Sequence, residues 1–147
     1  MTLQRRTPLS PVIALLVGLL GSVGLAVFWH LIVGTAKPRQ AGYLYTQYFT
    51  DCLSLLFAAV YFLLSIALGW TVRRPLLVAA GMILPLPIAL AIETVLDPTS
   101  HNLLPFEVIL YWLPAFGIAL LGAFLGRVAA SHPSNSPIRA DQANRSL

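Results

Sequence analysis

Four long runs of apolar residues alternate with short polar segments along the chain. They cover about residues 12–33, 52–70, 76–96 and 106–126. Because about 20 apolar residues in a helix span the hydrocarbon core of a bilayer, each run predicts one membrane-spanning helix. The pattern therefore predicts an all-α fold, an integral membrane four-helix bundle within a transmembrane domain of residues 1–127.

The polar segments predict how these helices are joined. Residues 73–75 form a connection short enough to force the second and third spans into an antiparallel hairpin. Residues 128–147 are polar and rich in serine and proline, which predicts a disordered tail. Pro87 and Pro114 lie at similar depths in the third and fourth spans, and each removes a backbone hydrogen bond. We expect them to kink their helices and to splay the outer halves of these spans.

Composition agrees with a membrane protein and excludes other classes. The chain has 147 residues, of which 58% are hydrophobic and 10% charged, with a mean hydropathy of +0.82. A soluble domain carries about 25% charged residues, so the four spans leave no room for one. The one cysteine, Cys52, excludes an internal disulfide and a cysteine-rich metal site.

The basic residues are divided unevenly between the two sides of the predicted bundle. Seven lie on the side of the termini, whereas the other side holds Lys37 and Arg39. Cytoplasmic loops carry an excess of lysine and arginine, so both termini are expected in the cytoplasm, with the protein integral to the cell (inner) membrane. The net charge of +4 then indicates contact with anionic lipid headgroups and not with nucleic acid. The seven are Arg5, Arg6, Arg73, Arg74, Arg127, Arg139 and Arg145.

Small residues recur at helical spacing in the first and fourth spans. Small side chains let helix backbones approach closely in lipid, so we expect contacts within the bundle at these positions. The alternative is an interface with a second copy or with a larger membrane complex. The positions are Gly18, Ser22, Ala26, Ala115, Ala119, Gly122, Ala123 and Gly126.

Four of the five acidic residues, all except Asp141, lie at the external ends of the predicted spans. Glu93 lies about one turn inside the third span, and ionisable residues within spans are functional candidates by default. Asp97 follows one turn later on the same helix face. His101 lies in the next loop, and Glu107 lies at the start of the fourth span. Because this loop joins the outer ends of two antiparallel helices, we expect the four side chains to approach one another. We call these four residues the outer cluster.

The outer cluster combines carboxylates with an imidazole, which are ligands for Zn, Mn or Fe, so it is a candidate metal site. With Asn102 and His30, which lie at the same level, it is also a candidate site for a ligand or a proton. Three of these residues also have a simpler interpretation. Asp97 caps a helix, Glu107 complements a helix dipole, and His30 lies at the membrane interface. The pattern assigns no catalytic residue and no cofactor.

The segment from Asp97 to Glu107 reads Asp-Pro-Thr-Ser-His-Asn-Leu-Leu-Pro-Phe-Glu and follows a span that contains a glutamate. It resembles a segment of small, uncharacterised four-span membrane proteins of bacteria, and the likeness covers the third and fourth spans. The resemblance implies that residues 93–107 act as one unit, and it implies no activity.

Three functions are therefore expected, in this order. The first is a non-catalytic membrane component that associates with itself or with a larger complex, in which the outer cluster supports the structure or binds a small ligand or cation. The second is a transporter or channel subunit in which Glu93 carries a proton or cation. The third is a metal-dependent enzyme that works at the external interface.

Overall fold

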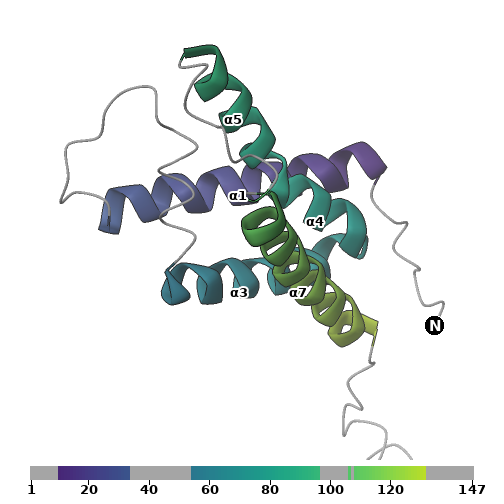
Figure 1. The fold of residues 1–147 in the computed structure, drawn as a ribbon. Helices are drawn as coiled ribbons and strands as arrows, with labels where there is room; N and C mark the ends of the chain where they lie inside the picture. Colours follow the sequence, from purple (N-terminus) through teal and green to yellow (C-terminus); the bar gives the residue numbers. More distant parts are fainter. Residues whose placement is uncertain (1–9, 34–53, 97–105, 107, 132–147) are drawn as a thin grey trace, which may run out of the picture.

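Every element that the structure describes is a helix (Figure 1). The structure is a computed structural model that describes residues 10–33, 54–96, 106 and 108–131. The all-α prediction is confirmed for this part of the chain. The elements are α1 (Pro11–Val33), α3 (Leu55–Val72), α4 (Pro75–Ile83), α5 (Pro85–Leu96), the π-helix η2 (Val108–Trp112) and α7 (Leu113–Ser131).

Four helical segments are long and apolar enough to cross a membrane, as the sequence predicts. Large apolar side chains such as Leu20, Leu63 and Leu110 remain exposed on their outer surfaces. Continuous apolar surface of this kind suits lipid, and the four segments therefore suggest a multi-pass membrane protein. The segments are Pro11–Ile32, Leu55–Val72, Pro75–Leu96 and Val108–Ser131.

Two spans end later than the sequence predicts. α3 continues to Val72, and α7 continues to Ser131. Gly126 does not end the fourth span, because it packs against α3 and the alanines after it are strong helix formers. Residues 128–131, predicted as the start of the tail, are therefore helical, and residues 132–147 lie outside the described residues.

The closest packing joins helices that are not neighbours in sequence. The most extensive contacts are those of α3 with α7 and those of α1 with α4. In Figure 1, α7 crosses the end of α3, and α4 lies against the first half of α1. Since successive spans alternate in direction, the two helices of each pair run parallel. The bundle is thus built from two parallel pairs.

Small residues make these two contacts possible. A Cβ atom added to Gly81 in α4 would come within 3.0 Å of the backbone nitrogen of Leu19 in α1. One added to Gly126 in α7 would lie 2.7 Å from the backbone nitrogen of Trp70 in α3. The predicted contacts within the bundle are confirmed for the buried small residues, whereas Ala26 and Ala115 are only half-buried. The buried ones are Gly18, Ser22, Ala119, Gly122, Ala123 and Gly126.

The turn between α3 and α4 consists of Arg73 and Arg74. Arg73 adopts the left-handed conformation with φ 59°, and its N–H donates to the carbonyl of Gly69 at 3.1 Å. A left-handed residue with this bond ends a helix and turns the chain. The Arg73 guanidinium also donates to the carbonyl of Ala130 at 3.5 Å, which ties the turn to the end of α7. The predicted hairpin of the second and third spans is formed by this turn.

A break divides the third span at Leu84, not at Pro87 as expected. Pro85 has no N–H to donate to the carbonyl of Gly81, and the N–H of Leu84 occupies this acceptor instead, at 3.3 Å. The shorter bond tightens the last turn of α4. A new helix then begins with proline in its favoured first position.

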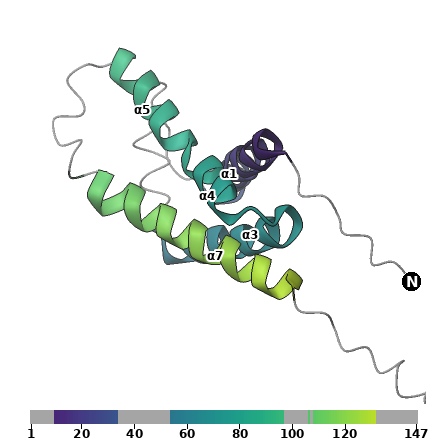
Figure 2. The same cartoon turned by 90° about the vertical axis from the view of Figure 1, so that its right-hand side faces the viewer.

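The fourth span is also irregular near its proline. The π-helix η2 ends two residues before Pro114, which is the second residue of α7. Pro114 lacks the N–H that would bond to the carbonyl of Leu110, so regular α-helical bonding cannot run through this point. Figures 1 and 2 both show α5 leaving the bundle, with its last turn apart from α3 and α7. The expected splaying of outer halves is thus seen in the third span.

Candidate functional site at the outer end of the third span

Glu93 is the one member of the outer cluster that the structure describes, and it is fully buried. His30, near the end of α1, has an exposed side chain, which agrees with an interfacial position. The approach of the four cluster residues to one another stays a prediction. The remaining candidates, Asp97, His101, Asn102 and Glu107, lie outside the described residues.

One face of α5 is buried, and Glu93 is the last residue on it. Leu86, Leu90 and Glu93 follow one another at helical spacing and are the buried residues of this helix. The residues that flank Glu93, from Ala91 to Leu96, are exposed. The burial of Glu93 therefore depends on the direction of its side chain and is not shared by the end of α5 as a whole.

Trp112, the last residue of η2, packs against the apolar part of this face. It is half-buried beside Leu86 and Leu90. Because α5 leaves the bundle, this contact with the fourth span helps to fix which way its buried face points. Glu93 therefore continues, at the outer end, an apolar wall that the third and fourth spans build together.

A carboxylate in this position is unfavourable by itself. A charged residue at the centre of a span costs roughly 2.5–3.5 kcal/mol in insertion experiments, and less towards the ends. Thr94, the next residue, satisfies its hydroxyl group within α5 by donating to the carbonyl of Leu90 at 2.8 Å. An ionised carboxylate can only accept, and the N–H groups of a helix interior are already bonded. As an anion, Glu93 must therefore be matched by other side chains, by water or by a ligand.

The described charged residues are separated along the bundle. Glu93 lies near the outer end of the third span, beyond the whole of α4, and the described arginines lie at the opposite end. From Arg74 to Glu93 the two helices extend about 28 Å along their axes at 1.5 Å per residue. None of the described arginines is therefore close enough to form an ion pair with this carboxylate. These arginines are Arg73, Arg74 and Arg127.

A metal site cannot be assembled from the described residues alone. Within this part of the chain, no group of three His, Cys, Asp or Glu side chains comes together. His30 and Glu93 are the only residues of these four types that it contains. The predicted metal site therefore depends on Asp97, His101 and Glu107, and it stays a prediction.

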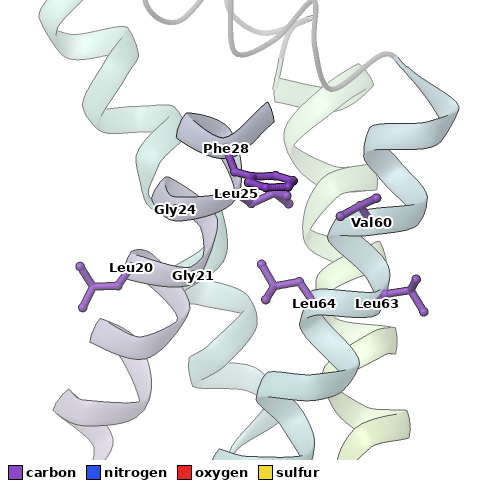
Figure 3. A pocket seen from close by; sticks show the side chains of 8 residues that line it. All are labelled: Leu20, Gly21, Gly24, Leu25, Phe28, Val60, Leu63 and Leu64. Carbon is purple, nitrogen blue, oxygen red and sulfur yellow. The ribbon is translucent and has the colours of Figure 1, made fainter. Parts of the chain in front are cut away.

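An apolar groove of about 470 Å³ lies between α1 and α3 (Figure 3). Leu25 and Phe28 from α1 and Leu64 from α3 point towards one another across it. The groove has no acidic, basic or hydroxyl side chain in its lining and does not include Glu93, so it is separate from the candidate site. Its lining consists of Leu20, Gly21, Gly24, Leu25, Phe28, Val60, Leu63 and Leu64.

Sequence reasoning did not find Trp112 or the aromatic contacts between α1 and α3. Trp29 meets Phe57 edge-on, with ring centroids 5.2 Å apart, and Phe57 stacks on Tyr61 at 6.1 Å. The contact of Trp112 could have been found from depth, because Trp112 and Leu90 lie about equally far from the outer ends of their spans. The contact between Trp29 and Phe57 had no such signal, since it depends on which spans pair. Phe57 and Tyr61 lie one turn apart within α3.

Comparison of the chain with protein-family models, with curated proteins and with solved structures finds no match. The resemblance of residues 97–107 to small four-span proteins of bacteria therefore stays a prediction. Any statement about function has to be carried by the residues of this chain.

Proposed function

We propose that this protein is a non-catalytic membrane component that binds a cation or a small polar ligand at its outer end, around Glu93. The observation that carries the proposal is the complete burial of Glu93 on the face that α5 shares with Leu86 and Leu90. The other buried residues of this face, Leu86 and Leu90, are apolar, so the carboxylate sets Glu93 apart from them. Acids within spans are rare, and they generally face a protein interior or a polar cavity where they serve a function.

The other members of the outer cluster would complete the site. Asp97, His101 and Glu107 follow Glu93 closely in sequence and supply two further carboxylates and an imidazole. A cation would balance the negative charge of such a group, and a hydrogen-bonding ligand would satisfy its acceptors. In this proposal, the cluster holds the ligand, and the apolar wall of α5 and Trp112 supports it from within the membrane.

We place this site on the external side of a bacterial inner membrane, with both termini in the cytoplasm. The support is that the described arginines lie at the end of the bundle opposite Glu93. Basic residues accumulate at the cytoplasmic ends of spans. Reporter fusions to the end of the chain and after Lys37 test this orientation, and an external C-terminus would contradict it.

The ligand-binding role is tested with Glu93→Gln, which keeps the size of the side chain and removes its charge. Parent and variant are reconstituted in lipid nanodiscs, and thermal unfolding is measured with and without Zn²⁺, Mn²⁺ and Na⁺. A cation at 100 times its Kd should stabilise the parent by about 2.7 kcal/mol. We expect Glu93→Gln to fold and to lose this stabilisation together with any bound metal.

Asp141→Asn is the matched control, because it removes an acid from the predicted tail. It should respond to the cations as the parent does. If parent and Glu93→Gln give the same unfolding temperatures and the same metal content under every condition, the ligand-binding role of Glu93 is wrong.

We further propose that the protein works in association with itself or with a larger membrane complex. Its described part presents apolar surface on all four spans and no soluble domain. Purification from native membranes in a mild detergent should recover an oligomer or additional subunits. A single monomeric species, unchanged by chemical crosslinking in the membrane, would contradict this part of the proposal.

A second candidate is a proton- or cation-carrying subunit, which the irregular spans favour. The third span breaks at Leu84, and the fourth contains a π-helix before Pro114. Interrupted helices at membrane depth are a recurrent feature of transporter binding sites. Purified protein in liposomes should then conduct protons or cations, and Glu93→Gln should abolish the flux. Absence of flux from the parent would leave the ligand-binding role as the better supported one.

A further inference from the structure

Three arginines at the end of the bundle opposite Glu93 have no part in the proposed site. They are Arg73, Arg74 and Arg127, which we call the arginine cluster. Glu93 is the only acidic residue in the described part of the chain, so no described carboxylate neutralises this end. A concentration of positive charge without a described counter-charge indicates an external anion.

The fold brings two of the arginines to one junction. Gly126 of α7 lies against the backbone of Trp70 in α3, and one turn later Ala130 accepts a hydrogen bond from Arg73. Arg127 lies between these two contact points on α7 and is exposed. The contact between the ends of α3 and α7 therefore places Arg73 and Arg127 at the same end of this helix pair, and Arg74 follows directly in the turn.

Within the part of the chain that the structure describes, the three guanidinium groups use little of their hydrogen-bonding capacity. Arg73 has one backbone carbonyl as a partner, at 3.5 Å. The structure gives the side chains of Arg74 and Arg127 no ion pair or hydrogen bond with the described residues. Each guanidinium carries five N–H donors in a planar fork that matches the oxygens of a phosphate group. Three such groups at one end of the bundle supply the kind of donor that a phosphate requires.

The neighbours of the arginine cluster place it at the level of lipid headgroups. Trp70, one turn before Arg74, has 55% of its surface exposed, and tryptophan is enriched at membrane interfaces. Leu76, two residues after Arg74, lies in the first turn of α4 and has 60% of its surface exposed. The arginines therefore lie between an interfacial tryptophan and lipid-facing side chains, where the nearest phosphates belong to the lipids themselves.

We propose that the arginine cluster binds the phosphate group of an anionic phospholipid in the leaflet at this end. Arg127 and Arg74 supply donors that no described residue occupies, and Arg73 adds charge while it ties the α3–α4 turn to α7. A bound headgroup would thereby bridge the second, third and fourth spans. This proposal does not depend on the ligand at Glu93 or on which side of the membrane is cytoplasmic.

The test uses the full-length protein in nanodiscs that contain phosphatidylcholine and phosphatidylglycerol. Native mass spectrometry of the released protein measures the ratio of the two lipids retained. Each arginine near the surface contributes about 1 kcal/mol of attraction to anionic lipid, which is roughly a fivefold preference. For Arg74→Gln/Arg127→Gln we therefore expect the preference for phosphatidylglycerol to fall roughly 25-fold. It should also fall in the parent as NaCl is raised.

The matched control is Arg139→Gln/Arg145→Gln, which removes two charges from the predicted tail and should keep the preference of the parent. Arg74→Lys/Arg127→Lys should keep part of it. Equal retention by the parent and the glutamine variant would overturn the proposal. So would inorganic phosphate that displaces the retained lipid, because the site would then take free phosphate. If the glutamine variant fails to fold, the salt dependence of the parent decides, and retention independent of salt refutes the proposal.

Discussion

Helices α4 and α5 share one membrane span, yet they are held in place in different ways. α4 packs backbone to backbone on α1, and four of its nine residues are buried. α5 has twelve residues and buries three, all on one face. The apolar part of that face is covered by Trp112 from the fourth span. The proline break at Leu84 separates the two arrangements.

The difference shows where this bundle has its stability and where it can accommodate function. In lipid, helices associate through close packing, because apolar surface alone gives no driving force. The inner half of the span, which is α4, meets this requirement through the contacts of Gly81 and of Gly18 in α1. The outer half of the span, which is α5, contains the buried carboxyl group of Glu93 in a helix that few other helices contact. Functional segments are generally drawn from such less stable regions.

The largest expected effect concerns the glycine contacts of the inner half. In Gly81→Ala, the added Cβ atom meets the carbonyl oxygen of Leu15, so α1 and α4 must separate. We expect the free energy of unfolding to fall by about 2 kcal/mol, as in other overpacked cores. Steric trapping or SDS unfolding in bicelles measures this change.

Gly24→Ala is the matched control for this substitution. It is also a glycine inside a helix, but no atom lies within 4 Å of its added Cβ. The gain in helix propensity is about 1 kcal/mol in both variants, so their difference isolates the close approach. If the two variants are equally stable, the tight pairing of α1 and α4 is not what holds the inner half.

The sequence was sufficient to predict the spans and the small-residue contacts, because both follow from periodic patterns in single helices. It predicted Gly18, Gly122 and Gly126 as contacts, and all three lie against another helix. It did not predict which helices pair. The parallel pairing of α1 with α4 depends on complementary surfaces of segments about 60 residues apart, and no periodicity within one segment reports that.

The position of the break and the surroundings of Glu93 show the same limit. Matching depths favoured Pro87 as the kink, whereas the hydrogen bond between Leu84 and Gly81 places the break before Pro85. The depth of Glu93 indicated a functional candidate but did not show that its side chain is fully buried. Burial depends on the rotation of α5 about its axis, which the contact with Trp112 helps to set.

A smaller effect is expected from removing apolar side chains on either side of the break. Met82 in α4 is 1% exposed and contacts the main core, whereas Leu90 in α5 is 9% exposed and belongs to a small separate cluster. Truncating a buried side chain in lipid costs mainly its lost packing contacts, because lipid is as apolar as the core and the transfer contribution is small. We expect Met82→Ala to cost about 1–2 kcal/mol and Leu90→Ala about half as much. The same unfolding assay compares them, and a larger loss for Leu90→Ala would show that the outer half is packed as firmly as the inner half.

The smallest effect on stability is expected from the prolines, although they determine the shape of the span. In Pro85→Ala the new N–H can donate to the carbonyl of Gly81, but Pro87 still has no N–H to donate to the carbonyl of Ile83. We therefore expect the break to move towards Pro87, and only Pro85→Ala/Pro87→Ala to give a continuous helix. Because the N–H of Leu84 already occupies the carbonyl of Gly81, the unfolding free energy should change by less than about 1 kcal/mol.

Spin labels at Leu76 and Leu96, both exposed, would follow the shape of the span in a Cys52→Ser background. A straight helix separates positions 20 residues apart by about 30 Å. The distance in the double proline variant should approach this value, and the control Ile88→Ala, on an exposed face of α5, should keep the distance of the parent. If the double variant also keeps that distance, the direction of α5 is set by its contact with Trp112. The missing N–H groups would then permit the bend without causing it.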